Sequence, residues 1–121
     1  MSESSEQKLL ISWFRQTWPE HNQCIRLSAN GCNFGTGKKA YMMINSLKAQ
    51  GLTPGESDLV FLCPRHNFHG LVIEYKALKG THPLTPKQED YLNYMSSQGY
   101  MSVCCKGLEA AKETIQSYMS S

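Results

Sequence analysis

The sequence predicts one α/β domain. Segments with helical spacing of apolar residues alternate with short apolar segments, in the order helix, strand, helix, strand, strand, helix, strand, helix. The length of 121 residues is typical of one domain, and no repeat or linker divides residues 1–121. The composition, with 40% hydrophobic and 18% charged residues, is that of an ordinary globular protein.

The first half of the chain predicts two helices and one strand. A helix begins at Ser4 or Ser5, ends at Trp18 before Pro19, and carries an apolar stripe. A strand at 24–28 and a glycine-rich polar stretch at 30–37 follow. The next helix, 38–50, ends before Gly51 and carries four apolar residues on one face: Ala40, Met43, Ile44 and Leu47.

The second half predicts three strands and two helices. The strands 58–63 and 71–77 flank a hairpin loop at 64–70. A helix at 86–98 has Thr85 as its N-cap, Pro86 at its first position and Gly99 after its end. The strand 100–105 and a final helix, 108–119, complete the order.

Charge is distributed unevenly along the chain. Residues 26–87 hold eight Lys or Arg and three acids, Glu56, Asp58 and Glu74, whereas the remainder holds four basic and seven acidic residues. A basic middle that contains isolated carboxylates suits a site that binds a polyanion through a metal. A solvated positive face is the alternative explanation.

Three charged residues in this middle segment predict a catalytic centre. Side chains alternate between the faces of a strand, so Glu74 and Lys76 share one face near the end of strand 71–77. In an antiparallel hairpin, Asp58 at the start of the preceding strand lies beside that end. Asp58, Glu74 and the backbone carbonyl of Tyr75 could then bind Mg²⁺ or Mn²⁺, with Lys76 assisting at a scissile phosphate. The alternative is a cross-strand salt bridge between Lys76 and one acid.

A collinear set of short segments resembles the VRR-NUC family, the virus-type replication-repair nucleases of the PD-(D/E)XK superfamily. The matching segments are Glu6-Gln7, Ala29-Asn30-Gly31, 47–51 (LKAQG), 55–59 (GESDL), 69–76 (HGLVIEYK), 84–88 (LTPKQ) and Gln98-Gly99-Tyr100. The resemblance implies the restriction-endonuclease-like α/β core, a mixed central sheet flanked by helices. Ser57 departs from the family, which usually has proline before the metal-binding aspartate.

The same resemblance implies two further site residues. Glu6 would be the acid that the first helix lends to the metal, although a first-turn acid favoured by the helix dipole is an equal alternative. Gln88 would lie near the metal and the attacking water, but Thr85 to Gln88 also forms a capping box in which Gln88 would only close the helix end.

Several residues are expected to contact DNA: Asn30, Lys38, Lys39, Lys48 and Lys79. The segment 35–39 (GTGKK) resembles a phosphate loop, but it is no Walker A motif because Cys32 and Lys39 stand where Gly and Ser or Thr are required. A flexible loop is the alternative.

A zinc site is not favoured by the loose spacing of Cys63, His66, His69 and His82, because zinc needs four converging ligands. The five cysteines predict packing roles and reduced thiols rather than a disulfide framework.

The sequence has no signal peptide and no apolar run of about 20 residues. We therefore expect an intracellular protein, in the cytoplasm of a bacterial or phage-infected cell, with no membrane partner.

The resemblance implies a Mg²⁺- or Mn²⁺-dependent endonuclease that hydrolyses DNA phosphodiester bonds, in a homodimer that cuts four-way junctions. A symmetric dimer presents two sites to a symmetric branch. Two alternatives remain open: a flap or non-specific nuclease, and a DNA-binding module with the same fold but no catalysis. The aromatic side chains of Trp13, Phe14, Trp18 and Tyr41 belong either to a dimer interface or to the core.

Overall fold

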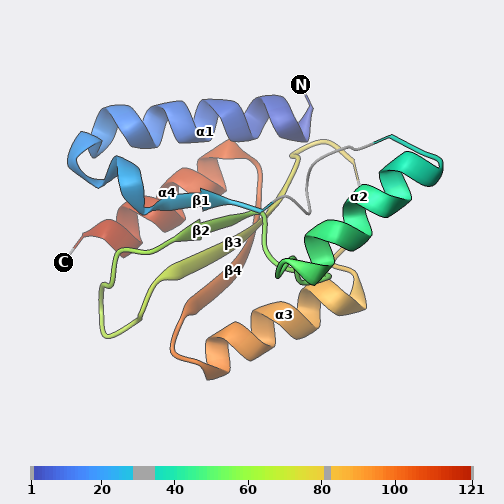
Figure 1. The fold of residues 1–121 in the computed structure, drawn as a ribbon. Helices are drawn as coiled ribbons and strands as arrows, with labels where there is room; N and C mark the ends of the chain where they lie inside the picture. Colours follow the sequence, from blue (N-terminus) through green and yellow to red (C-terminus); the bar gives the residue numbers. More distant parts are fainter. Residues whose placement is uncertain (1, 29–34, 81–82, 121) are drawn as a thin grey trace.

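The computed structural model describes residues 2–28, 35–80 and 83–120 (Figure 1). Its sheet has the strand order β1-β2-β3-β4, with β1 at Ile25–Leu27, β2 at Leu59–Phe61, β3 at Leu71–Lys76 and β4 at Met101–Lys106. The pairs β1–β2 and β2–β3 are antiparallel, and β3–β4 is parallel. The parallel pair needs a crossover, which α3 supplies between its two strands.

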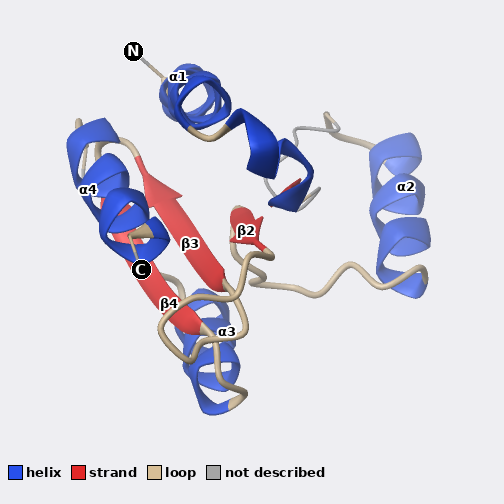
Figure 2. Ribbon diagram, turned by 90° about the vertical axis from the view of Figure 1, so that its left-hand side faces the viewer, coloured by secondary structure: helices blue, strands red, loops and turns tan. Residues whose placement is uncertain are grey.

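Helices cover both faces of the sheet. Helices α1 (Glu3–Thr17) and α4 (Leu108–Met119) lie on one face, and α3 (Pro86–Ser97) lies on the other, against β3 and β4 (Figures 1 and 2). Strand β3 is therefore buried on both sides from Leu71 to Tyr75. The sequence of a strand that is buried on both faces is a continuous run of apolar residues rather than an alternation of apolar and polar ones. Glu74 is the acid in this run.

The main core lies between the sheet and the α1–α4 layer. Leu10 and Phe14 of α1 and Ile115 of α4 are fully buried there against Phe61 and Ile73. The rings of Phe14 and Phe61 lie 5.1 Å apart between centroids. Burying each such side chain contributes about 1.5–3 kcal/mol. This packing fixes α1 over β2 and β3, and the first turn of α1 is thereby held near the sheet end where the predicted acids lie.

The mixed sheet flanked by helices confirms the expected fold class, and every predicted helix and strand is present. The sequence analysis missed η1, a 3₁₀ helix at Pro19–Cys24 that turns the chain from α1 into β1. Pro19 ends α1 but suits the first position of a new helix, which explains the immediate restart. Among the described residues, no helix is long and apolar enough to cross a membrane.

The apolar face of α2 (Lys38–Ala49) is only partly buried. Ala40 is buried and Ile44 and Leu47 are half-buried, but Met43 is exposed. The reason is that α2 stands apart from the sheet, so a narrow strip of it is covered (Figure 2). Of the four aromatic residues weighed above, Phe14 is core, Trp13 and Trp18 pack against the core, and Tyr41 is exposed.

A tight turn before β2 rests directly on the first turn of α3. Gly55 has a φ of +81°, and a Cβ atom at this position would lie 2.5 Å from the backbone carbonyl carbon of Lys87. Only glycine combines this φ with so close an approach. This contact packs the chain just before Asp58 against the first turn of α3, which contains Gln88.

We predict that Gly55→Ala lowers the free energy of unfolding by about 2–5 kcal/mol, from left-handed strain and overpacking together. Gly51→Ala is the matched control, because Gly51 also has a positive φ, +122°, but nothing lies within 4 Å of the added Cβ. The control should lose only about 1–2 kcal/mol. Chemical denaturation of the three chains measures both values, and equal losses would contradict the close approach.

Candidate active site

Asp58 and Glu74 lie opposite each other at one end of the β2–β3 pair. Leu59 pairs with Ile73, so the antiparallel register places the preceding residue, Asp58, across from Glu74. The backbone N–H of Tyr75 donates to Asp58 Oδ2 at 2.8 Å, and the N–H of Ser28 donates to the Asp58 carbonyl at 2.9 Å. Asp58 is 8% exposed and Glu74 is 2% exposed. Two buried carboxyl groups thus meet at a fixed position.

The environment of Glu74 strongly disfavours its charged form. Burial, followed by a hydrogen bond and charge repulsion from Asp58, raises the pKa of Glu74 from 4.5 to about 9, and Lys76 opposes the shift. The metal-free protein therefore favours the protonated form of Glu74. A cation that replaces this proton would relieve the repulsion between the two carboxylates.

Lys76 lies on the same face of β3 as Glu74 and reaches Gln88. Its Nζ lies 3.8 Å from Glu74 Oε2 and donates to Gln88 Oε1 at 3.2 Å. Gln88 also forms the capping box, because its Oε1 accepts from the N–H of Thr85 at 3.0 Å. One oxygen atom therefore closes the helix end and contacts Lys76, while the role of Gln88 near a metal and the attacking water stays a prediction. The capping hydrogen bond fixes the side-chain amide of Gln88, and this amide in turn positions the ammonium group of Lys76.

Glu6 is buried, and its side chain contacts the other face of the sheet. Its Oε1 accepts from the Tyr75 hydroxyl at 2.6 Å, and Tyr75 faces the α1–α4 core rather than the side of Glu74. Burial and the hydrogen bond to Glu6 raise the pKa of Tyr75. A metal-binding role of Glu6 stays a prediction.

Glu3 is a second acid of α1 that the sequence analysis did not single out. Its charge adds to the raised pKa of Glu74, and it lines the same groove as Asp58. The signal was present in the sequence, because Glu3 lies one helical turn before Glu6 and so on the same side of the helix. It was missed because the family resemblance began at Glu6.

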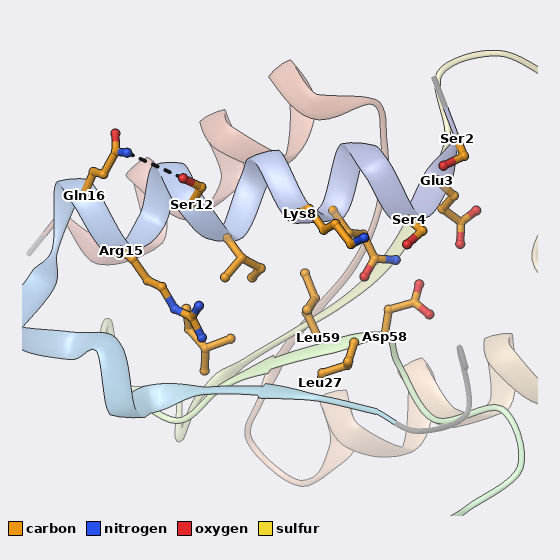
Figure 3. Close-up of a pocket in the computed structure, with 13 residues that line it drawn as sticks. Ser2, Glu3, Ser4, Lys8, Ser12, Arg15, Gln16, Leu27, Asp58 and Leu59 are labelled. Atoms are coloured by element: carbon orange, nitrogen blue, oxygen red, sulfur yellow. Dashed lines mark hydrogen bonds between the residues drawn. The ribbon is translucent and has the colours of Figure 1, made fainter. Parts of the chain in front are cut away.

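A groove of about 1000 Å³ runs between α1 and the strands β1 and β2. Figure 3 shows Glu3 and Asp58 at one end of it and Arg15 toward the other, with Lys8 between them on α1. Leu27 and Leu59 form part of its floor. Lys8 and Arg15 lie outside the basic middle of the sequence, so only the fold brings them into line with Asp58.

The remaining predicted DNA contacts lie at three separate places. Lys38 and Lys39 begin α2, Lys48 lies in its last turn, and Lys79 follows β3; all four are exposed. Asn30 lies outside the described residues. No contact or bound group tests these assignments, which stay predictions.

The donor atoms at the Asp58–Glu74 pair fit a hard divalent cation. Mg²⁺ and Mn²⁺ prefer oxygen ligands, commonly one or two carboxylates completed by water and phosphate. Two buried carboxyl groups that lie opposite each other supply such a set. The carbonyl of Tyr75, the further predicted ligand, is adjacent in the chain. Ser57, at the position where the family usually has proline, is buried, and its hydroxyl has no hydrogen-bond partner in the described part of the chain.

We predict that the metal-free chain becomes less stable as pH rises from about 4.5 to about 9. Over this range the folded state keeps the proton of Glu74 that the unfolded chain has released, so higher pH favours unfolding. The slope reaches at most about 1.4 kcal/mol per pH unit. Urea denaturation across this range should show a flatter dependence for Glu74→Gln. Glu109→Gln, at an exposed position of α4, should keep the original slope. Equal slopes in all three chains would contradict the raised pKa of Glu74.

The comparisons with known proteins agree with this geometry. The profile of the VRR-NUC domain matches residues 2–109. A solved structure described as a VRR_NUC domain protein is similar to the chain, with 24% sequence identity and a TM-score of 0.78 over 98% of this chain and 88% of the other. A comparison with the curated proteins gave no match. Since the profile covers most of the chain, the protein belongs to the VRR-NUC family of nucleases.

Proposed function

We propose that the protein hydrolyses phosphodiester bonds of DNA in a reaction that depends on Mg²⁺ or Mn²⁺. The observation that carries the proposal is the buried Asp58–Glu74 carboxyl pair beside Lys76. Membership of a nuclease family implies DNA as the substrate. A purely structural salt bridge explains the pair poorly, because a lysine that only neutralised one acid would leave the second carboxyl group buried at a cost in stability.

The side chains have separable tasks in this reaction. The cation, when bound, acidifies a water molecule and stabilises charge on the scissile phosphate. Asp58 is positioned by the N–H of Tyr75, so its second carboxylate oxygen is left for a ligand. Lys76, held by Gln88, presents its ammonium group next to Glu74, where it can orient the attacking water and neutralise the growing phosphate charge.

The groove along α1 suits one strand of the substrate. Its length joins Asp58 to the basic side chains of Lys8 and Arg15 (Figure 3). Cationic groups along a groove position the phosphate backbone without reading sequence. The lysines Lys38, Lys39, Lys48 and Lys79 would then contact more distant parts of a substrate that is larger than a single strand.

A branched substrate and a homodimer form the finer part of the proposal. Helix α2 exposes apolar side chains at Tyr41, Met42 and Met43, and adjacent exposed apolar residues favour association. Two copies related by a two-fold axis would offer one active site to each of two strands of a four-way junction. A flap or non-specific nuclease is the second candidate, because a groove lined by Lys8 and Arg15 would accept the phosphate backbone of any DNA strand.

We predict that Asp58→Asn and Glu74→Gln each lower the cleavage rate by about 10²–10³-fold or more. DNA affinity, which rests on the basic groups, should change by less than roughly threefold. Cleavage assays and fluorescence anisotropy with the same labelled DNA measure the two effects, and Glu109→Gln serves as the matched control. Joint loss of cleavage and binding would contradict the assignment of these acids to catalysis. Full cleavage by both variants would favour a site elsewhere.

We also predict that four-way junction DNA is cut faster than flap, nicked or linear duplex DNA of the same sequence. The assay compares the four labelled substrates with Mg²⁺, with Mn²⁺ and with EDTA, and sedimentation measures the mass of the protein at the same concentration. Equal cutting of linear duplex would overturn the junction preference. Activity that persists in EDTA would overturn the metal-dependent mechanism, and a monomer that resolves junctions would overturn the dimer.

A further inference from the structure

A second cluster of possible metal ligands lies at the far end of the sheet from Asp58. One ligand atom each of His21, Cys24 and Cys63 lies within 4.8 Å of the others. Asp58 precedes β2 and Cys63 follows it, so the length of β2 separates this cluster from the active site. His21 and Cys24 belong to η1, the 3₁₀ helix that links α1 to β1.

Contacts among the neighbouring groups hold the three residues in place. The Cys24 carbonyl accepts from the N–H of Leu62 at 2.8 Å, which ties η1 to the end of β2. The Cys63 carbonyl accepts from the buried Tyr118 hydroxyl at 2.6 Å. The two thiols are free, their sulfur atoms lie within 4.8 Å of each other, and Cys63 is 3% exposed. The ligand set therefore exists before any ion arrives.

The His21 imidazole offers a nitrogen ligand of the kind that transition metals bind. Its Nε2 lies 3.3 Å from Arg65 Nη2. A guanidinium group only donates, so this contact uses the Nε2 lone pair, and a metal ion bound at Nε2 would replace Arg65 there. The nearby Glu20 carboxylate, 3.9 Å from the same nitrogen, is exposed and forms a longer contact. Neutral imidazole is the form that binds transition metals.

We propose that His21, Cys24 and Cys63 bind one Zn²⁺ ion, and that a water molecule completes the four ligands that zinc needs. Two sulfurs and one imidazole nitrogen are a ligand set typical of zinc, and they differ from the oxygen ligands of the Asp58–Glu74 pair. Zinc holds sulfur at about 2.3 Å, so two thiolates in a tetrahedral site lie about 3.8 Å apart. Ligand atoms already within 4.8 Å of one another need only a small movement to reach this spacing.

The ion would fasten η1 to the end of β2 and thereby hold α1 over the sheet. A disulfide between Cys24 and Cys63 is the competing use of the same thiols, but it would leave His21 without a part in the cluster. The ligands of this proposed zinc site also differ from the Cys and His residues whose spacing was considered in the sequence. Cys63 is gathered with residues of η1, whereas His66 Nε2 contacts the Ser117 carbonyl, and the His69 ring packs against Tyr100.

Cobalt is the probe for this site, because Co²⁺ bound to thiolates absorbs in the near ultraviolet whereas Co²⁺ bound to carboxylates does not. The full chain is freed of metal with a chelator, kept in a non-thiol reductant and titrated with Co²⁺. We expect one equivalent per chain to give the thiolate band and one equivalent of Zn²⁺ to remove it. Zn²⁺ should also raise the Tm by several degrees, since it binds the folded state.

Three variants locate the ligands. Cys24→Ser should abolish the band, and His21→Asn, at a half-buried position where the fold tolerates change, should weaken Co²⁺ binding by at least about tenfold. Cys104→Ser is the matched control, because Cys104 is exposed and remote from the cluster, and it should keep the band. Asp58→Asn should keep the band as well, so the outcome is independent of the proposed nuclease site.

Absence of the band in folded wild-type chain would overturn the zinc site, as would a band of unchanged affinity in Cys24→Ser or His21→Asn. Mass spectrometry of chain purified without reductant provides a second check. A Cys24–Cys63 disulfide with no bound zinc would assign the thiols to redox chemistry instead.

Discussion

The pairing of β2 with β3 is the constraint on which the rest of the site depends. Because Leu59 pairs with Ile73, Asp58 lies across from Glu74, and the N–H of Tyr75 fixes the aspartate side chain. A shift of one residue in this register would move Glu74 and Lys76 away from Asp58 and turn apolar side chains toward α3. The register is strongly specified, because β3 is buried on both faces and the core residues Leu71, Ile73 and Tyr75 fit one alignment.

The fold supports a charged site in a region that would otherwise be part of the core. Glu74 is almost fully buried next to a second acid, which raises its pKa and disfavours the metal-free ionised state. Such an arrangement reduces stability, and its persistence is typical of functional sites. Gln88 limits this loss of stability, because its amide oxygen both closes the end of α3 and accepts a hydrogen bond from Lys76.

Helix α1 links the regions of functional interest. Its buried face packs Leu10 and Phe14 against the sheet, its first turn brings Glu3 to the groove near Asp58, and its exposed side carries Lys8 and Arg15 along that groove. At its C-terminal end, η1 carries His21 and Cys24 to Cys63. The position of α1 therefore affects both the proposed active site and the proposed zinc site, which lie at opposite ends of β2.

The sequence by itself determined the order of the elements, the alternation that puts Glu74 and Lys76 on one face, and the capping box at Gln88, because these follow from local periodicity and turn chemistry. It also identified the family, since the matching segments are collinear. Only the tertiary structure decided that Glu6 contacts the Tyr75 hydroxyl, that Glu3 lines the same groove as Asp58, and that Cys63 lies beside His21 and Cys24. The exposure of Met43 likewise depended on where α2 lies relative to the sheet. These contacts join residues far apart in the chain, and their geometry is set by core packing rather than by local pattern.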